Sequence, residues 1–346
     1  MSAKKQAAGG LLDLYAHNRH IFRLVIVMLV WMVFMALTKF SKFYTLINFQ
    51  TMTSQFPEFG LMALGVMLCM ITGGIDLSAV GIANLSAILM GFLLKAIVRE
   101  DGGLPFYAIP LVFVLGMALG AVMGTFNGIL VSKVHIPPIL ATLGTSELFT
   151  GIAIVITNGN AVSKLPVEYA LTINSKLGGL VPVQLLIFIA AALILWALLS
   201  RTTYGTKIYM LGTNPEAARF SGLKNDRLLI KTYMLSGVCA ALGGLIMLAN
   251  YNSARANYGA VYVLQCVLIV VLGGVSPMGG RGRISGVVLA IFLLRMLETG
   301  INRFPQISSY YISLIWGSVL LLVMVLDYFT NREFHPARRI KAGTGT

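Results

Sequence analysis

Two apolar runs joined by a glycine-containing break decide the architecture of this chain. Residues 57–98 read PEFGLMALGVMLCMITGGIDLSAVGIANLSAILMGFLLKAIV, in which the stretches 57–72 and 79–98 are predominantly apolar. A helix that crosses a bilayer needs about 20 predominantly apolar residues. The second stretch meets this requirement, whereas the first looks short for a full crossing. We therefore expect a membrane protein in which some of the spanning helices are short or broken.

The composition of the whole chain supports this expectation. Of its 346 residues, 57% are hydrophobic and only 11% are charged, whereas about a quarter of the residues in a typical soluble domain are charged. We predict an all-α polytopic membrane protein with about ten transmembrane helices. The expected segments are 24–38, 57–72, 79–98, 105–131, 139–157, 181–200, 231–250, 263–275, 284–303 and 311–328.

The distribution of basic residues predicts the orientation of these helices. Short cytoplasmic loops of membrane proteins are enriched in Lys and Arg, and the loop 201–231 carries six of the 26 in this chain. With that loop in the cytoplasm, both termini are cytoplasmic as well. Basic loops that face anionic lipid account for the net charge of +14 without nucleic acid as a partner. The predicted organisation is an N-terminal cytoplasmic tail (1–23), a membrane domain (24–328) and a C-terminal cytoplasmic tail (329–346).

A short helix is expected inside this basic loop, which reads RTTYGTKIYMLGTNPEAARFSGLKNDRLLIK. Asn214 is a typical N-cap residue and Pro215 is tolerated in the first helical turn. Gly222 is a typical residue just past a helix end. A short capped helix on the cytoplasmic face suits docking onto a soluble partner, and an ordinary connecting loop is the alternative.

Two of the expected segments, 57–72 and 263–275, look short for a full crossing, and both end in a glycine pair. Glycine disfavours regular helix, and Pro277 after the second pair would break a helix outright. A break at membrane depth is tolerated only inside the protein or along a water-filled cavity, so these breaks point to a translocation path. Two simple turns at the interface are the alternative. The pairs are Gly73-Gly74, within MITGGIDLSAVG (70–81), and Gly273-Gly274, within VLGGVSPMGGRG (271–282).

Two acidic residues near the apolar runs have both a functional and a structural interpretation. Asp76 with Ser78 suits the start of the next helix as a cap, and an ion-binding or proton-carrying role is the less favoured alternative. Glu147 lies near the middle of 139–157 among hydroxyl residues such as Thr145. That stretch suits a path for a hydrophilic solute, and a carboxylate hydrogen-bonded within the bundle is the alternative.

Other polar residues and the cysteines are expected to be structural. Arg295 and Glu298 lie three residues apart on one expected helix and can pair, and Glu58 is expected at the membrane interface. The cysteines lie in apolar runs without metal-ligand spacing, so we expect small buried hydrophobic residues and no metal site. They are Cys69, Cys239 and Cys266.

Motifs of common catalytic and nucleotide-binding sites are absent from the sequence. It contains no GxxxxGK[ST], no GxSxG, no HExxH and no Cys/His cluster. We therefore expect no catalytic residue and no bound cofactor. The energy for any transport comes either from an ion gradient or from another subunit.

Four motifs in order resemble one family, the permease subunits of ribose-type (carbohydrate uptake) bacterial sugar ABC importers. The similarity covers residues 45–328, and the first and third motifs together are specific. The motifs are TGGIDLS (72–78), IPPILATLGT (136–145), NPEAARFSG (214–222) and LGGVSPMGGRG (272–282).

The resemblance implies a multi-pass protein of the bacterial inner membrane that works in a complex. Two permease chains, identical or different, form an alternating-access path for a sugar that a periplasmic binding protein delivers. A cytoplasmic ATP-binding subunit docks on them and supplies the site for ATP and Mg. The third motif matches the part that meets this subunit, so the resemblance assigns ATPase coupling to Asn214, Pro215, Glu216, Ala217, Ala218, Arg219 and Gly222.

The chain also departs from the family pattern. Val263–Ile269 stands where the family commonly has Glu-Leu-x-Ala-Ile-Ala-Ala, so the usual acidic residue is absent. Ala79 is inserted in the first motif, and Glu147 stands where an apolar residue is more usual.

The alternative function is a self-contained ion-coupled secondary transporter with Asp76 or Glu147 in its coupling site. For either function, the residues expected along the translocation path are Gly73, Gly74, Asp76, Thr145, Glu147, Gly273 and Gly274.

Overall fold

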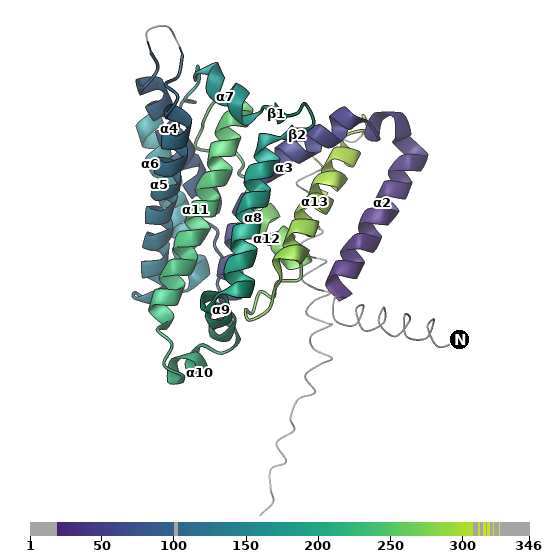
Figure 1. Ribbon diagram of the computed structural model, residues 1–346. Coiled ribbons are helices and arrows are strands. Elements are labelled where there is room, and N and C mark those ends of the chain that lie inside the picture. Colours follow the sequence, from purple (N-terminus) through teal and green to yellow (C-terminus); the bar gives the residue numbers. More distant parts are fainter. Residues whose placement is uncertain are drawn as a thin grey trace, which may run out of the picture.

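The computed structural model describes residues 19–99 and 103–306, together with seven single residues between 311 and 325. The described chain is a bundle of helices with one two-stranded hairpin (Figure 1). The helices are α2 (Arg19–Phe43), α3 (Leu46–Ile71), α4 (Ala79–Ala96), α5 (Ala108–Ser132), α6 (Pro138–Thr157), α7 (Val167–Ile173), α8 (Val183–Arg201), α9 (Thr203–Thr213), α10 (Pro215–Phe220), α11 (Asn225–Tyr251), α12 (Tyr262–Leu272) and α13 (Ile284–Ile301), and the antiparallel strands are β1 (Lys176–Leu177) and β2 (Val181–Pro182).

The prediction of an all-α polytopic membrane protein is confirmed. Eight of the described helices are long and apolar enough to cross a membrane, and α12 is a shorter apolar helix of 11 residues. The tenth expected segment, 311–328, lies for the most part outside the described residues, as do the tail 329–346 and residues 1–18 of the N-terminal tail. The structure therefore does not test the expected count of ten.

One expected boundary was wrong, because the helix assigned to 57–72 begins much earlier. Helix α3 has 26 residues and passes through Pro57. Its first turns contain polar residues that pair inside the protein. Asn48 donates a hydrogen bond to Phe43 O (2.7 Å), and Gln50 donates one to Gly179 O (3.1 Å). Because of these polar residues, the first half of the helix is not part of an apolar run and was not assigned to the span. The break at Gly73 therefore follows a full-length helix.

Helix α11 lies at the centre of the bundle and contacts α5, α3 and α4. The contact with α5 follows a stripe of glycines four residues apart along one face of α5. A Cβ at Gly120 would lie 2.6 Å from Ala241 Cβ, and one at Gly128 would lie 2.6 Å from Ile230 Cα. The two backbones are therefore in direct contact, as is common for helices that pack in lipid. The stripe consists of Gly116, Gly120, Gly124 and Gly128.

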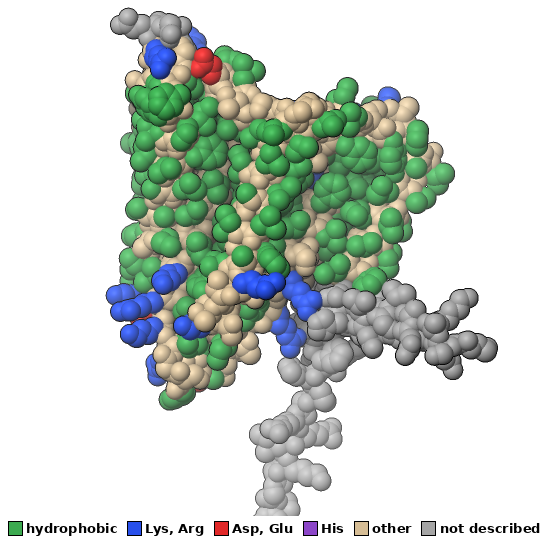
Figure 2. Space-filling model, in the orientation of Figure 1, with side chains coloured by type: hydrophobic (Ala, Val, Ile, Leu, Met, Phe, Trp, Pro, Cys, Tyr) green, Lys and Arg blue, Asp and Glu red, His purple; other side chains and the backbone are tan. Residues whose placement is uncertain are grey.

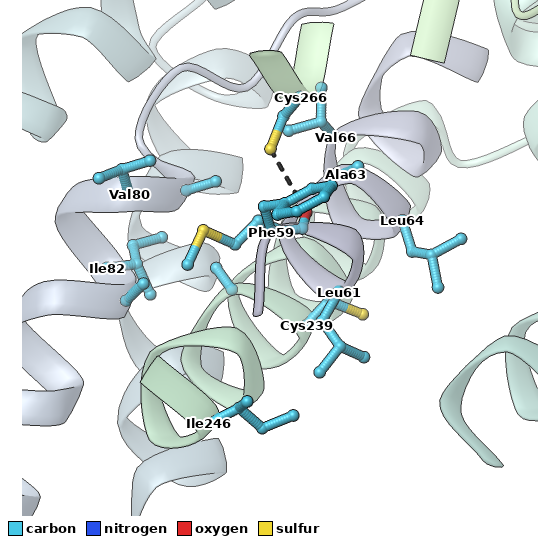
Figure 3. Packing of buried hydrophobic residues seen from close by; sticks show 14 of the residues in the cluster. Phe59, Leu61, Ala63, Leu64, Val66, Val80, Ile82, Cys239, Ile246 and Cys266 are labelled. Carbon is cyan, nitrogen blue, oxygen red and sulfur yellow. Dashed lines mark hydrogen bonds between the residues drawn. The ribbon is translucent and has the colours of Figure 1, made fainter. Parts of the chain in front are cut away.

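Helix α3 lies inside the bundle, where its residues pack against α4, α11 and α12 (Figure 3). The cysteines belong to this core. All three are free and buried, as expected, and Cys266 Sγ donates a weak hydrogen bond to Phe59 O (3.5 Å). In contrast, α2, α5, α6 and α8 expose many apolar side chains on the flanks of the bundle (Figure 2). This pattern of a packed interior and an apolar outer surface is that of a membrane domain.

The glycine stripe can be tested by adding one methyl group. In Gly120→Ala, the new methyl group would overlap Ala241 and the backbone of α11, and overpacking of this kind costs about 1–3 kcal/mol. We expect a lower midpoint of thermal unfolding, measured by tryptophan fluorescence of the detergent-purified protein. The matched control is Gly151→Ala on α6, where a Cβ would meet nothing within 4 Å. Helix propensity should leave its midpoint unchanged or slightly raised. Equal midpoints for the two variants would contradict the contact.

Candidate functional site

The first glycine pair ends α3, as the sequence predicted. Gly73 has a left-handed backbone (φ 86°). Gly73 N donates to Met70 O (3.0 Å) and Gly74 N donates to Cys69 O (3.1 Å). These two bonds form a Schellman motif, in which a left-handed residue closes the last turn of a helix. The chain then runs through residues 75–78 into α4.

The second glycine pair ends α12 with the same motif, shifted by one residue. Here Gly274 is left-handed (φ 84°), while Gly273 is the C-cap. Gly274 N donates to Val271 O (2.9 Å) and Val275 N donates to Val270 O (3.2 Å). The following loop, residues 273–283, borders a hollow of about 740 Å³ whose lining includes both glycines of the pair.

The two breaks meet in space although they are 200 residues apart in the chain. Gly280 N, in the loop after α12, donates to Ile71 O at the end of α3 (2.8 Å). A Cβ at Gly279 would lie only 2.8 Å from Gly73 N. The loop 273–283 therefore lies directly against the first break, and side chains at these glycines would separate the two segments.

Helix α9 contacts both breaks. A Cβ at Gly212, near its C-terminus, would lie 2.5 Å from Gly280 N and would also meet Ile71 O. Tyr209 Oη donates to Gly282 O (2.8 Å). Burial raises the pKa of the Tyr209 phenol, so the group stays protonated and remains a donor near neutral pH. Helix α9 is therefore fixed to the end of α3 and to the loop after α12.

The short helix predicted after Asn214 is present as α10, which follows α9 directly. Asn214 Oδ1 accepts from Ala217 N (3.0 Å), and Pro215 is the first helical residue. Gly222 is left-handed (φ 80°), and Leu223 N donates to Ala218 O (3.1 Å), so the helix ends as expected. Only Asn214 separates α9 from α10.

Helix α10 presents most of its side chains to the outside. Ala218 is buried, whereas Glu216 and Arg219 are exposed. Phe220 is 84% exposed and was not among the expected coupling residues. An aromatic residue in a short polar helix was the signal that could have identified it. Lys and Arg side chains gather at this end of the molecule (Figure 2), and all six of the basic loop are exposed: Arg201, Lys207, Arg219, Lys224, Arg227 and Lys231.

Asp76 lies buried between the first break and α4, where hydroxyl and amide donors hold its carboxylate. Oδ1 accepts from Ser78 N (2.9 Å) and Ser78 Oγ (2.6 Å), and Oδ2 accepts from Ser236 Oγ of α11 (2.7 Å). Asn127 Nδ2 of α5 donates to Ser78 Oγ (2.6 Å). These contacts fix the turn that leads into α4, whose N-cap is Ser78. Both carboxylate oxygens of Asp76 are thus used in hydrogen bonds that hold this turn, which favours a structural role.

Of the two path residues expected on α6, Thr145 lies one turn from Thr142, which hydrogen-bonds to Ile75 O and Leu77 N beside Asp76, whereas Glu147 faces outward. Thr145 is buried and donates to Thr142 O of its own helix (3.2 Å). Glu147 is exposed on an outer face of α6 beside apolar residues such as Leu148 and Val155. Within the described part of the chain it has no hydrogen-bond or ion-pair partner, so the alternative of a carboxylate bonded inside the bundle is wrong. A path role for either residue stays a prediction.

Glu58 was expected at the membrane interface, at the start of a span; the structure places it in the middle of α3 with its side chain buried. Its side chain is only 5% exposed. Asn250 Nδ2 donates to Glu58 Oε2 (2.8 Å), and Tyr262 Oη donates to Glu58 Oε1. Because α3 begins eleven residues earlier than expected, Glu58 lies inside the bundle and not at a helix start. Arg295 and Glu298, which form the expected ion pair (2.9 Å), line the same cavity as Glu58.

The structural role of Asp76 can be tested by Asp76→Asn. An amide keeps the shape but replaces one acceptor oxygen with a donor, so Ser78 or Ser236 loses its partner. A buried donor without a partner costs about 1–3 kcal/mol, and we expect a lower thermal unfolding midpoint in detergent. The matched control is Asp226→Asn in the exposed first turn of α11, which should change the midpoint less. An unchanged midpoint for Asp76→Asn would contradict this role.

Comparison with known proteins identifies the family. A family described as "Branched-chain amino acid transport system / permease component" matches residues 48–326. The ribose import permease protein RbsC of Bacillus subtilis (strain 168) is 35% identical over 81% of this chain and 84% of its own length. The autoinducer 2 import system permease protein LsrC of Escherichia coli (strain SMS-3-5 / SECEC) is 33% identical over 77% and 75%.

A further relative, the galactose/methyl galactoside import permease protein MglC of Haemophilus influenzae, is 29% identical over 82% of this chain and 87% of its own length. No solved structure matches the chain significantly. The resemblance given by the four motifs is confirmed. The chain belongs to this family of transport-system permease components and is a multi-pass protein of the bacterial inner membrane.

Proposed function

We propose that this chain is the permease subunit of an ATP-driven importer and forms, with a second permease chain, the path for a sugar or sugar-like solute. The observation that carries this proposal is the sequence of contacts from α10 through α9 to both helix breaks. Helix α10 is exposed for docking, and α9 touches the end of α3 and the loop 273–283. A partner that moves α10 therefore acts on both breaks at once.

The proposed orientation places α9 and α10 in the cytoplasm, because basic loops stay on that side. Helix α7 and the strands β1 and β2 then lie at the periplasmic end (Figure 1). Ten crossings with both termini inside follow when α12 and the segment 311–328 are counted as spans. The division remains a cytoplasmic tail (1–23), a membrane domain (24–328) with a coupling loop (201–231), and a second tail (329–346).

The proposed coupling surface consists of Asn214, Pro215, Glu216, Ala217, Ala218, Arg219 and Gly222, to which we add Phe220. Beside it, α9 and α10 enclose a mainly apolar groove of about 520 Å³. An exposed aromatic residue next to such a groove is typical of the few residues that carry most of an interface's binding energy. The partner is an ATP-binding subunit that holds ATP and Mg, since this chain has no nucleotide-binding motif.

The proposed mechanism is a rigid-body movement. ATP binding closes the partner and displaces α10, and Gly212 and Tyr209 pass the displacement to the ends of α3 and α12. Packed elements that slide or rotate as units open one side of a path and close the other. Ribose, galactose and autoinducer 2 stand in the names of the relatives, which supports a sugar-like solute delivered by a periplasmic binding protein.

The ion-coupled alternative finds no support at Asp76. Both carboxylate oxygens already accept hydrogen bonds from serine residues, and an ion would have to displace them. Glu147 faces outward from α6, where a second permease chain or lipid contacts it. We therefore assign the energy source to the partner subunit.

Docking can be tested with Phe220→Ala. Loss of an exposed aromatic anchor typically costs at least about 2 kcal/mol of binding energy, so we expect several-fold less ATPase subunit to co-purify from native membranes in mild detergent. The matched control is Phe106→Ala, which removes a phenylalanine that is 90% exposed at the opposite end of the molecule. It should leave co-purification unchanged. Equal recovery with both variants, or no ATPase with the unaltered chain, would contradict the proposal.

Transmission can be tested separately with Tyr209→Phe. This variant loses the hydrogen bond to Gly282 O but leaves α10 intact. We expect normal ATPase docking with less solute transported per ATP hydrolysed, measured in proteoliposomes that contain the whole complex. Tyr107→Phe, at an exposed tyrosine at the periplasmic end, is the control. An unchanged transport-to-hydrolysis ratio for Tyr209→Phe would show that this contact does not transmit movement.

A further inference from the structure

We propose that the polar cavity around Glu58 and Gln184 is a binding site for a neutral, polyhydroxylated solute within the permease itself. This inference rests on the proposed function, because it assigns to the solute of that importer an intermediate binding site along its path. The cavity measures about 380 Å³, which is within the range of about 300–1,000 Å³ typical of small-molecule sites.

The cavity lies at the end of the bundle opposite to α10. Glu58 comes from α3, Gln184 from the first turn of α8, Asn250 from the end of α11 and Tyr262 from the start of α12. The exposed residues Asn174, Lys176 and Tyr251 also line it, so it opens to the outside. In the proposed orientation this mouth faces the periplasm, where solute arrives.

The lining is exceptionally polar for a membrane bundle. Of its twelve residues, Pro182 is the only one without a polar side-chain group, in a chain that is 57% hydrophobic. Polar side chains inside a membrane domain are costly and mark substrate pathways. A cavity that served only as a packing defect would be apolar.

Buried groups in the lining still lack partners. Gln184 is 0% exposed, and its Nε2 donates to Asn250 Oδ1 (2.7 Å) and to Asn174 Oδ1, while its Oε1 has no partner. Arg295 Nε is likewise buried without a partner. A buried polar atom left unsatisfied costs about 1–3 kcal/mol, so a native protein keeps one where a ligand or water completes it. Both residues line the cavity, although these two atoms have no accessible surface in this conformation.

The charges of the lining favour a neutral solute over an ion. Arg295 pairs with Glu298 (2.9 Å), and Glu58 accepts from Tyr262 and Asn250. No group of three His, Cys, Asp or Glu side chains suited to a metal occurs in the described part of the chain. A polyol presents adjacent hydroxyls, each a donor and an acceptor, which carboxamide and carboxylate groups match. The rings of Tyr251 and Tyr262 can pack on its apolar faces.

Two helices, α3 and α12, run from the cavity to the glycine breaks near α9. Glu58 and Tyr262 lie on α3 and α12, and these are the two helices that end at the glycine breaks. A movement that reaches the breaks through α9 therefore shifts two walls of the cavity relative to α8 and α11. The solute would stay bound in the cavity until this movement shifts the walls that α3 and α12 provide.

The first test uses ATP-driven uptake by the complete complex in proteoliposomes, with tritium-labelled D-ribose and D-galactose as probes. Gln184→Leu removes the acceptor and both donors, and we expect the KM for uptake to rise at least tenfold with a smaller change in kcat. Glu58→Gln is the milder second variant in case Gln184→Leu folds poorly. The matched control is Gln265→Leu, at a buried glutamine outside this cavity.

The second test measures occupancy directly. Ser54 lines the cavity, and the three native cysteines are buried, so Ser54→Cys provides the reactive thiol for a methanethiosulfonate reagent. We expect the transported sugar to slow this labelling. A complex that transports a probe with ATP, shows an unchanged KM in both variants and shows no protection would overturn this inference alone. A complex that takes up a probe independently of ATP would overturn the proposed function together with it.

Discussion

The direct backbone contact between α5 and α11 is the constraint on which the rest of the structure depends. In lipid there is little hydrophobic gain in joining two helices, so association relies on close packing and internal hydrogen bonds. The glycine stripe of α5 brings α11 close enough for Ser236 to reach Asp76, and Asn127 on α5 reaches Ser78. The turn before α4 is held from both sides by this helix pair. Without that contact the turn after Gly73 would lose the hydrogen-bond partners of Asp76 and Ser78.

The ends of α3 and α12 form a rigid junction that α9 contacts. Helices α3 and α12 end in the same Schellman motif, and the hydrogen bond from Gly280 N to Ile71 O joins the two ends. Helix α9 fits into this junction because Gly212 has no side chain. Glycine thus serves two different purposes, a left-handed backbone at Gly73 and Gly274 and close approach at Gly212. Together they let three segments from distant parts of the chain share one small contact region next to α10.

Helix ends and caps could be predicted from the sequence because they depend on neighbouring residues. Side-chain contacts between residues far apart in the chain could not be predicted in this way. The caps of α10 and the glycine ends of α3 and α12 depend on neighbouring residues, and these predictions were confirmed. The burial of Glu58 was not predicted, because its partners, Asn250 and Tyr262, lie about 200 residues further along the chain. The outward direction of Glu147 was also unpredictable, since a helix that is apolar on all sides gives no facing signal. The four-residue spacing of glycines in α5 was visible, but in a chain with 36 glycines it does not stand out until α11 is placed against it.

The proposed solute site and the contacts with α9 lie at different positions along the same two helices, α3 and α12. Glu58 lies near the middle of α3 and Gly73 just beyond its end, while Tyr262 and Gly273 bracket the short helix α12. Tyr262, at the start of α12, donates to the carboxylate of Glu58, which α3 supplies. A carboxylate introduced from α3 moves with the first break as well as the second. Since both breaks contact α9, the proposed coupling would let a movement of α10 change the geometry of this polar site.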